Sequence, residues 1–417
     1  MRPLRVRSLV WLLTASLAAA GVLAVEPADA ARGAAKSAKA AKKDAKKDTK
    51  KETKTAKTEG GYRSYAQYDK DATAYWQSVV DMRRVRIAKR NRGEPIVLTD
   101  YVLTQPPLWS GPPVRRPLPP ATPGVPRLPL VSHMLTMAAE QHGFVPQRPA
   151  NDLEFKRAYA GIATAAGVTQ QQAVRIYAFE TGGNGTYDVQ SGLTHPSRKA
   201  RAISSAIGYN QLLTPNSIGL LAAHGDRFLE TLQSKAATLS GPERAAMDKK
   251  IAATKKMVAF VRTVPYQWVE HEKLAQTKRA GVGIHAALFD IDLGPLLQTQ
   301  KLVESLAFAK SKGHEQPLTG AELEMMNLTG DGNGIDLVTM PDEMRSQVPT
   351  SNFFQRYGYE RNPIARRTGV VSALYASMNA KMDRISQLPG AVELAVAFAE
   401  VADGVVTASA GAQPTKP

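Results

Sequence analysis

The sequence predicts a mainly α-helical protein, and three observations lead to this fold class. Apolar residues recur at helical spacing in most segments after residue 130. Glycine or proline stands at nearly all of the ends of these segments, where helices commonly stop. Sustained alternation of apolar and polar residues, the pattern of a half-buried strand, is missing from the sequence. Only the short stretches 96–103 and 335–338 are candidate strands.

The first 30 residues have the pattern of a secretory signal peptide. Arg2, Arg5 and Arg7 precede the apolar run SLVWLLTASLAAAGVLAV, and the small-residue motif Ala28-Asp29-Ala30 follows it. This order is typical of an export signal and its cleavage site. An uncleaved membrane anchor is the alternative, which the cleavage motif disfavours. We therefore expect a secreted protein of the periplasm or cell envelope.

Residues 31–60 are low in complexity and strongly basic. They contain ten Lys and one Arg against four acids, a net charge of +7. Because few of these residues could join a hydrophobic core, we expect a disordered linker. Its charge suits either contact with an anionic envelope surface or a solvated spacer. Nucleic acid would also fit the charge, but an export signal argues against that partner.

Residues 61–129 are expected to form an N-terminal extension. The segment DMRRVRIAKRNRG predicts a helix with a basic face, and EPIVLTDYVL predicts a short extended piece. Residues 106–129 are rich in proline, which favours polyproline or irregular chain over helix or sheet. Trp109 and several leucines favour an arm packed along the domain over an exposed linker.

Residues 130–403 are expected to be one helical domain, followed by a disordered tail at 404–417. The run 227–262 is helical in pattern and rich in charge, so it predicts a solvated helical hairpin. We expect a monomer. The segments with helical spacing are 131–143, 153–167, 170–180, 214–225, 227–239, 243–264, 294–313, 368–388 and 391–404.

Composition excludes several kinds of site. Cysteine is absent, which rules out disulfides, thiolate metal ligands and a cysteine nucleophile. The seven histidines are scattered without the paired spacing of a zinc site. DGNGID at 331–336 begins like a calcium loop, but Ile335 and Asp336 break the pattern, so a plain turn is expected. We expect neither a metal nor a cofactor.

A glutamate on an apolar helix face is the first candidate for chemistry. Thr169 and Gln172 have the spacing of a capping box, and Gly182 and Gly183 end the helix that carries Glu180. Burial and the negative end of the helix dipole both disfavour a charged carboxylate here, so the pKa of Glu180 should be raised. A carboxyl that stays protonated near neutral pH can protonate a glycosidic oxygen. The alternatives are a surface glutamate or one paired with a core arginine.

A second motif follows this helix. The segment AISSAIGYNQLLTPNS occupies residues 202–217, and its Gln211 lies 31 residues after Glu180. Together, ETGGN and IGYNQLL resemble motifs of the lytic transglycosylase family, whose fold is that of goose-type lysozyme. The resemblance covers about 40 residues of the chain. It implies a lysozyme-like helical domain in residues 130–403.

The resemblance also implies roles for individual residues. Glu180 would be the catalytic acid and base, whereas Ser205, Tyr209, Asn210 and Gln211 would line the sugar subsites. Three departures from the family pattern stand in this segment: Tyr209 and Asn210 replace an apolar pair, Thr214 is an extra residue before Pro215, and Ser205 replaces a usual glycine.

The third landmark of the family is a tyrosine-asparagine pair on a later helix. In ELEMMNLTGDGNG, residues 322–334, Asn327 matches the asparagine, but Met326 occupies the place of the tyrosine that holds the catalytic acid. Tyr177, Tyr357 and Tyr359 are candidates for the missing hydroxyl. Tyr357 is also a candidate for contact with substrate.

The implied activity is cleavage of the β-1,4 bond between N-acetylmuramic acid and N-acetylglucosamine in peptidoglycan strands. Glu180 would protonate the leaving oxygen and then deprotonate the muramyl 6-hydroxyl, which closes a 1,6-anhydro ring. This chemistry needs one carboxyl rather than the usual two. If Asp188 lay across the cleft, a hydrolase using water on peptidoglycan or a chitin-like polymer would be the alternative. We expect Asp188 to be a turn residue and His195 a loop residue. A non-catalytic envelope-binding protein is the remaining alternative.

Overall fold

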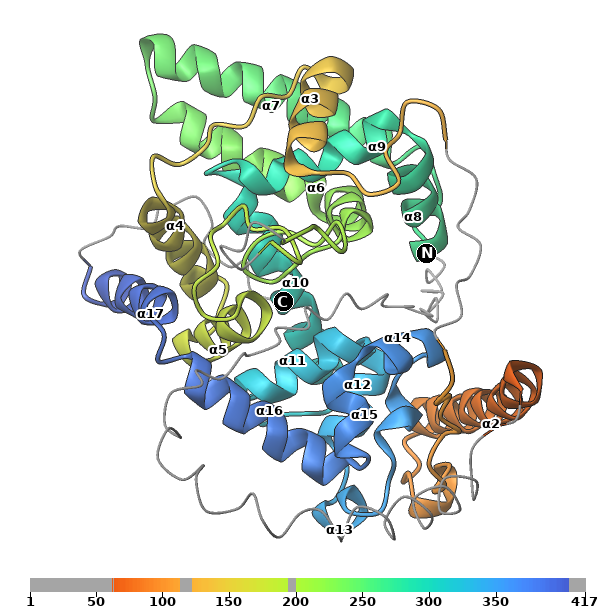
Figure 1. Ribbon diagram of the computed structural model, residues 1–417. Coiled ribbons are helices and arrows are strands. Elements are labelled where there is room, and N and C mark those ends of the chain that lie inside the picture. The colour runs from red at the N-terminus through yellow and green to blue at the C-terminus, as the bar shows by residue number, and fades with distance from the viewer. Residues whose placement is uncertain (1–61, 63, 113–121, 194–199, 405–417) are drawn as a thin grey trace, which may run out of the picture.

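The computed structural model describes residues 62, 64–112, 122–193 and 200–404 (Figure 1). The predicted signal peptide, the linker at 31–60, His195 and almost all of the tail lie outside these residues, as does part of the proline-rich arm. Within them the regular elements are helices, and β-structure is limited to isolated bridges such as Gln190 with Ile207. The mainly α fold class is therefore confirmed. No single helix in the described part is long and apolar enough to cross a membrane.

Two hydrophobic cores organise these helices. The first core unites most elements between residues 131 and 311 with the last helix of the chain. In Figure 1 its upper part is formed by α3 and α6 to α9. Its helices are α3 (Val131–His142), α4 (Asp152–Ala165), α5 (Gln170–Thr181), α6 (Thr214–Ala237), α7 (Gly241–Val261), α8 (Trp268–Thr277), α9 (Arg279–Ile284), η2 (His285–Phe289), α10 (Leu293–Ser311) and α17 (Pro389–Ala402).

The second core joins the beginning of the described chain to its last third. In Figure 1 it occupies the lower half, where the orange α2 lies beside the blue helices. Its elements are α2 (Tyr65–Arg92), η1 (Leu98–Asp100), α11 (Gly320–Thr329), α12 (Asp331–Val338), α13 (Asp342–Arg345), η3 (Thr350–Phe353), α14 (Arg356–Arg361), α15 (Pro363–Thr368) and α16 (Val371–Ile385).

Several elements contribute to both cores. Helix α12 gives Ile335 and Val338 to the first core and Leu337 to the second. Ile385 at the end of α16 belongs to the first. Helix α11 turns Leu323 and Met326 to the first core and Met325 and Leu328 to the second. The side chain of Phe179, near the end of α5, packs against both. The seam between the cores therefore runs along α11 and past the end of α5.

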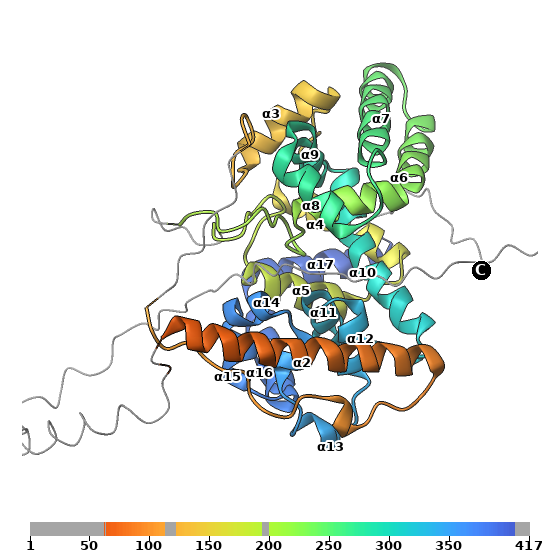
Figure 2. The same cartoon turned by 90° about the vertical axis from the view of Figure 1, so that its right-hand side faces the viewer.

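The N-terminal extension is more integrated than the sequence predicted. Helix α2 lies across the second core in Figure 2, and Tyr68, Ala72, Trp76 and Val79 are buried there. The ring of Trp109 lies against Tyr65 and Tyr68, with centroids 5.4 and 5.7 Å apart. The first part of the proline-rich arm is thus packed on the domain, as its aromatic and leucine content suggested.

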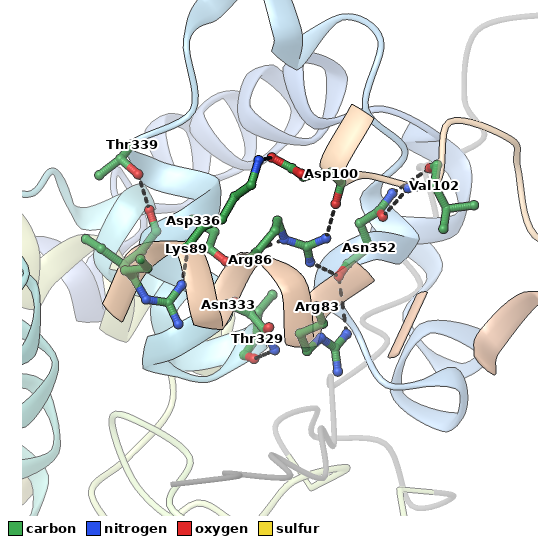
Figure 3. A network of polar contacts seen from close by, with 12 residues as sticks. Arg83, Arg86, Lys89, Asp100, Val102, Thr329, Asn333, Asp336, Thr339 and Asn352 are labelled. Carbon is green, nitrogen blue, oxygen red and sulfur yellow. Dashed lines mark hydrogen bonds and ion pairs between the residues drawn. The ribbon is translucent and has the colours of Figure 1, made fainter. Parts of the chain in front are cut away.

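A buried polar network fastens α2 to the second core (Figure 3). Arg86 is fully buried and donates to the carbonyl oxygens of Asp100 and Asn352 at 3.0 and 3.1 Å. Asp336 of α12 pairs with Arg90 and lies 3.5 Å from Nε of Arg86. Arg83 donates to the Asn352 carbonyl from the same helix face. Since a buried charge is costly without a partner, this network fixes the position of α2.

Both candidate strands are wrong. Residues 96–103 contain the 3-10 turn η1 instead of a strand. Residues 335–338 belong to α12, whose first residue, Asp331, accepts a hydrogen bond from Ser305 at 2.6 Å. The segment DGNGID therefore starts a helix instead of forming a calcium loop or a simple turn. The alternation that suggested a strand is too short to distinguish it from a buried helical turn.

The predicted helical hairpin is present as α6 and α7, but α6 is longer than the pattern indicated. It continues through Gly225, which we expected to end a helix. A β-carbon at Gly225 would lie 2.5 Å from Cγ2 of Val258 on α7. This glycine allows close helix packing rather than a helix stop.

Candidate active site

The helix that carries Glu180 begins and ends as predicted. The Thr169 side chain accepts a hydrogen bond from the backbone amide of Gln172, and the side-chain oxygen of Gln172 accepts one from the backbone amide of Thr169. Gly182 and Gly183 have positive φ values of 70° and 81°. A β-carbon at Gly183 would also lie 2.5 Å from the Ile385 carbonyl oxygen, so glycine is needed for both reasons.

Glu180 lies in the last turn of α5 and is half-buried. Its side chain meets two helices of the second core, because Glu324 of α11 and Lys381 of α16 are its main electrostatic neighbours. Burial raises the pKa of Glu180, whereas the hydrogen bond with Glu324 and the charge of Lys381 lower it. The direction predicted from the sequence is the direction found.

Glu324 is the most unusual residue of the site. Its side chain is 0% exposed, and neither carboxyl oxygen meets a donor in good hydrogen-bond geometry, although the Asn327 amide lies close. Burial, followed by the negative charge of Glu180, raises the pKa of Glu324 well above its usual range. A protonated carboxyl at Glu324 would not need an external donor beside Glu180, because its own O–H is a donor. The raised pKa therefore favours the neutral form of Glu324, whose O–H can donate to Glu180.

Lys381 adds a positive charge beside the two carboxyls. Its Nζ lies 3.9 Å from the centroid of the Phe179 ring, and it makes no close ion pair with either glutamate among the described residues. Burial lowers the pKa of Lys381, while the two glutamates raise it. The lysine thus acts on the pair through space and favours the charged form of both carboxyls.

The tyrosines considered for the missing hydroxyl have other surroundings. The Tyr177 hydroxyl donates to the Gly185 carbonyl oxygen at 2.7 Å. Tyr359 is buried in the second core against Trp76. Tyr357 is 43% exposed, and the guanidinium of Arg361 lies 3.9 Å from its ring centroid. The group that contacts Glu180 is a carboxyl, Glu324, where a tyrosine was expected.

The second motif does meet the helix of Glu180, but through packing. The rings of Tyr209 and Tyr177 are perpendicular, with centroids 4.8 Å apart. The Tyr209 hydroxyl donates to the Asp152 carboxylate at 3.1 Å. Asn210 donates to the Gln298 carbonyl oxygen at 2.8 Å.

Tyr209 and Asn210 are buried, and their contact with a sugar stays a prediction. They are 0% and 2% exposed, and their hydrogen bonds hold the loop against α4 and α10. Gln211 is also buried, with a positive φ of 44°, and donates to the Gly208 carbonyl oxygen. Ser205 is half-buried, and its hydroxyl accepts from the Thr214 amide. Substrate contact by Ser205 and Gln211 stays a prediction.

Two further predictions can be compared with the structure. Asn327 stands three residues after Glu324 on the same face of α11, beside the carboxyl pair as the motif suggested. Asp188 is held by Arg148 and by the Thr186 hydroxyl, so it has the local role expected of a turn residue.

Glu324 and Lys381 were not identified from the sequence, although Glu324 left a signal. It falls at helical spacing with Ala321, Met325 and Leu328, all of them buried. A glutamate on the apolar face of α11 is the same anomaly as Glu180 on α5. Lys381 stands at the edge of a buried stripe on α16, where a lysine is unremarkable.

Comparisons with protein-family models, curated proteins and solved structures each find no match for this chain. The similarity to lytic transglycosylases thus remains a prediction from two short motifs.

Proposed function

We propose that the protein is a lytic transglycosylase that cleaves the β-1,4 bond between N-acetylmuramic acid and N-acetylglucosamine in peptidoglycan. The observation that carries this proposal is the half-buried Glu180 beside the fully buried Glu324, with the pKa of both carboxyls raised by burial. The predicted export signal and the basic linker are consistent with a place in the periplasm or cell envelope. The linker would bring the enzyme to an anionic surface.

The geometry favours chemistry with one carboxyl. In retaining glycosidases the two carboxyl groups are about 5–5.5 Å apart, and in inverting enzymes about 6.5–9.5 Å. Glu324 is in hydrogen-bonding contact with Glu180 and has no exposed surface, so it cannot reach a sugar as nucleophile or base. Asp188 is occupied by Arg148 and Thr186. Neither acid fits the second role.

Each step of the reaction has a group to perform it. The protonated Glu180 gives its proton to the glycosidic oxygen as the bond to C1 breaks. The resulting carboxylate then takes the proton of the muramyl 6-hydroxyl, whose oxygen forms the new bond to C1. Glu180 ends in its starting state. Burial favours the protonated form, while Glu324 and Lys381 favour the carboxylate, so the proton can pass in both directions.

The test is digestion of purified cell-wall sacculi by the mature protein, with the products analysed by mass spectrometry. We expect 1,6-anhydromuramyl ends from the wild type and a loss of at least about a hundredfold in rate for Glu180→Gln, which removes the transferable proton. Glu230→Gln, at an exposed position of α6, is the matched control and should leave the rate unchanged.

Other results of this digestion would indicate a different activity or a different site. Reducing ends in place of anhydro ends would identify a hydrolase that uses water. Full activity in Glu180→Gln would refute the site. No product from a folded wild-type protein would favour an envelope-binding role without catalysis.

A further inference from the structure

A large cavity lies at the seam between the two cores, apart from Glu180. Its volume is about 1020 Å³, and none of its lining residues belongs to the Glu180 group. The walls come from α2, α6, α8, α10 and the junction of α11 with α12. Figure 2 shows α2 crossing in front of α12, with the lower end of α10 beside them.

Positive charge dominates the cavity wall. Four cations line it, Arg83, Arg90, Lys301 and Lys312, against two carboxylates. Both carboxylates have partners elsewhere, because Glu304 pairs with His224 and Asp331 accepts from Ser305. The cavity therefore carries a net positive potential, which its low-dielectric walls strengthen.

Two of these cations have no acidic partner among the described residues. Lys301 makes no ion pair there. Arg83 is only 5% exposed, and its guanidinium donates to the carbonyl oxygens of Asn352 and Phe354 (Figure 3), while its Nε has no partner. A buried cation that faces a cavity with only dipoles for partners is a site for an anion.

The rest of the wall is suited to a sugar. Tyr266, Trp268 and Phe308 provide aromatic surface, and Asn216 and Asn333 provide amides. Aromatic rings pack against apolar faces, whereas amides bond hydroxyl groups.

Two buried ring nitrogens of this wall lack partners. His271 is 4% exposed and its Nε2 has none, and the same holds for Nε1 of Trp268. Such orphaned polar atoms are costly unless a ligand or a solvent molecule completes their hydrogen bonds.

We propose that this cavity binds a carboxylate-bearing saccharide, with the carboxylate on Lys301 and Arg83 and a sugar ring against Trp268. The inference rests on the proposed function, because it makes the cavity a second subsite for the same glycan. Helix α11 links the sites: Thr329 lines the cavity and Glu324 contacts Glu180. Five residues of helix correspond to about 7.5 Å along its axis. Acidic peptidoglycan strands would thereby be preferred over neutral chitin-like chains.

The experiment measures binding by calorimetry on the full-length mature chain with Glu180→Gln, so that no turnover occurs. The ligands are a tetrasaccharide of alternating N-acetylglucosamine and N-acetylmuramic acid with free lactyl carboxylates, and the same tetrasaccharide with those carboxyls reduced to alcohols. We expect the acidic form to bind about tenfold more tightly at low salt, as one charge-assisted hydrogen bond provides. Added salt should diminish the difference.

Matched variants assign the effect to the cavity. Lys301→Ala should abolish the preference for the acidic ligand, whereas Lys310→Ala, at an exposed position of the same helix, should preserve it. Trp268→Ala should weaken the binding of both ligands by the same factor. Thermal melting checks that each variant is folded. Equal affinities for the two ligands, an unaltered preference in Lys301→Ala, or no binding of either would each overturn the proposal.

The proposed function and the proposed binding site in the cavity can be refuted independently. Binding is measured without cleavage, so an inactive wild-type protein could still prefer the acidic ligand. Anhydro products without any carboxylate preference would leave the proposed function standing and remove only the cavity assignment.

Discussion

At the scale of residues, the Glu180–Glu324 pair combines a feature that the sequence revealed with one that it concealed. A glutamate on the apolar face before two glycines pointed to Glu180 and to its raised pKa, because both follow from local helix geometry. Its partner could not be located in the same way, since α5 and α11 are more than a hundred residues apart and only tertiary packing joins them. The resemblance pointed to a tyrosine beside Glu180, whereas the structure has the carboxyl of Glu324 there.

The raised pKa of Glu324 makes stability depend on pH. The native state keeps this proton, whereas the unfolded state loses it above about the usual pKa of 4.5. The native state then binds more protons, so the free energy of unfolding falls as pH rises from the unfolded pKa toward the native one. Glu324→Gln removes this titration. It should therefore stabilise the protein more at pH 7 than at pH 4.

Urea unfolding at pH 4 and pH 7 tests this expectation. The gain from Glu324→Gln should be present at pH 7 and nearly absent at pH 4, and Glu230→Gln should show no such dependence. An equal gain at both pH values would contradict a buried neutral Glu324.

At the scale of elements, the helices were predictable where their own sequence determines them. The capping box of α5 and its glycine exit are local signals, and the structure contains both. The helix predictions were wrong where tertiary packing determines whether a segment is helical. Gly225 stays inside α6 because Val258 needs the space, and 331–338 is helical against α2 and α11. Helix α8 was missed, because its ten residues are mostly polar.

The attachment of α2 through Asp336 gives a prediction at this scale. Asp336→Ala would leave Arg86, which is fully buried, without its carboxylate. Breaking such a buried pair typically costs about 3–5 kcal/mol. Asp342 pairs with Arg345 at the surface, and the Asp342 side chain is 89% exposed. Asp342→Ala should therefore lower the free energy of unfolding by at most about 1 kcal/mol. The free energies of unfolding in urea compare the two, and similar losses would show that the buried network is dispensable.

At the scale of the whole molecule, the division into an extension and a single domain was too simple. The sequence of 61–129 contains few long apolar runs, so it did not indicate a share in a core. The structure buries Tyr68, Trp76 and Tyr101 of this region beside residues from 321 to 382. Such long-range pairing cannot be read from spacing along the chain.

Truncation tests this integration. A chain of residues 62–404 includes both cores and should melt in one cooperative transition. A chain of residues 130–404 lacks α2, which uncovers apolar residues of the second core such as Phe353, and it should lose cooperative melting or become insoluble. Circular dichroism melting of the two proteins gives the comparison. An undiminished melting temperature in the shorter chain would establish residues 130–403 as an independent domain.

Phe179 has a consequence for the acid beside it. Its ring is wedged between the two cores, and the carboxyl of the next residue meets Glu324 and Lys381, which both belong to helices of the second core. The proton affinity of Glu180 is consequently set by residues from both sides of the seam between the cores. A polymer that spans the seam and pulls the two halves together would alter the spacing of the three charges. Binding of a glycan strand and the pKa of Glu180 would then be coupled at the position of Phe179.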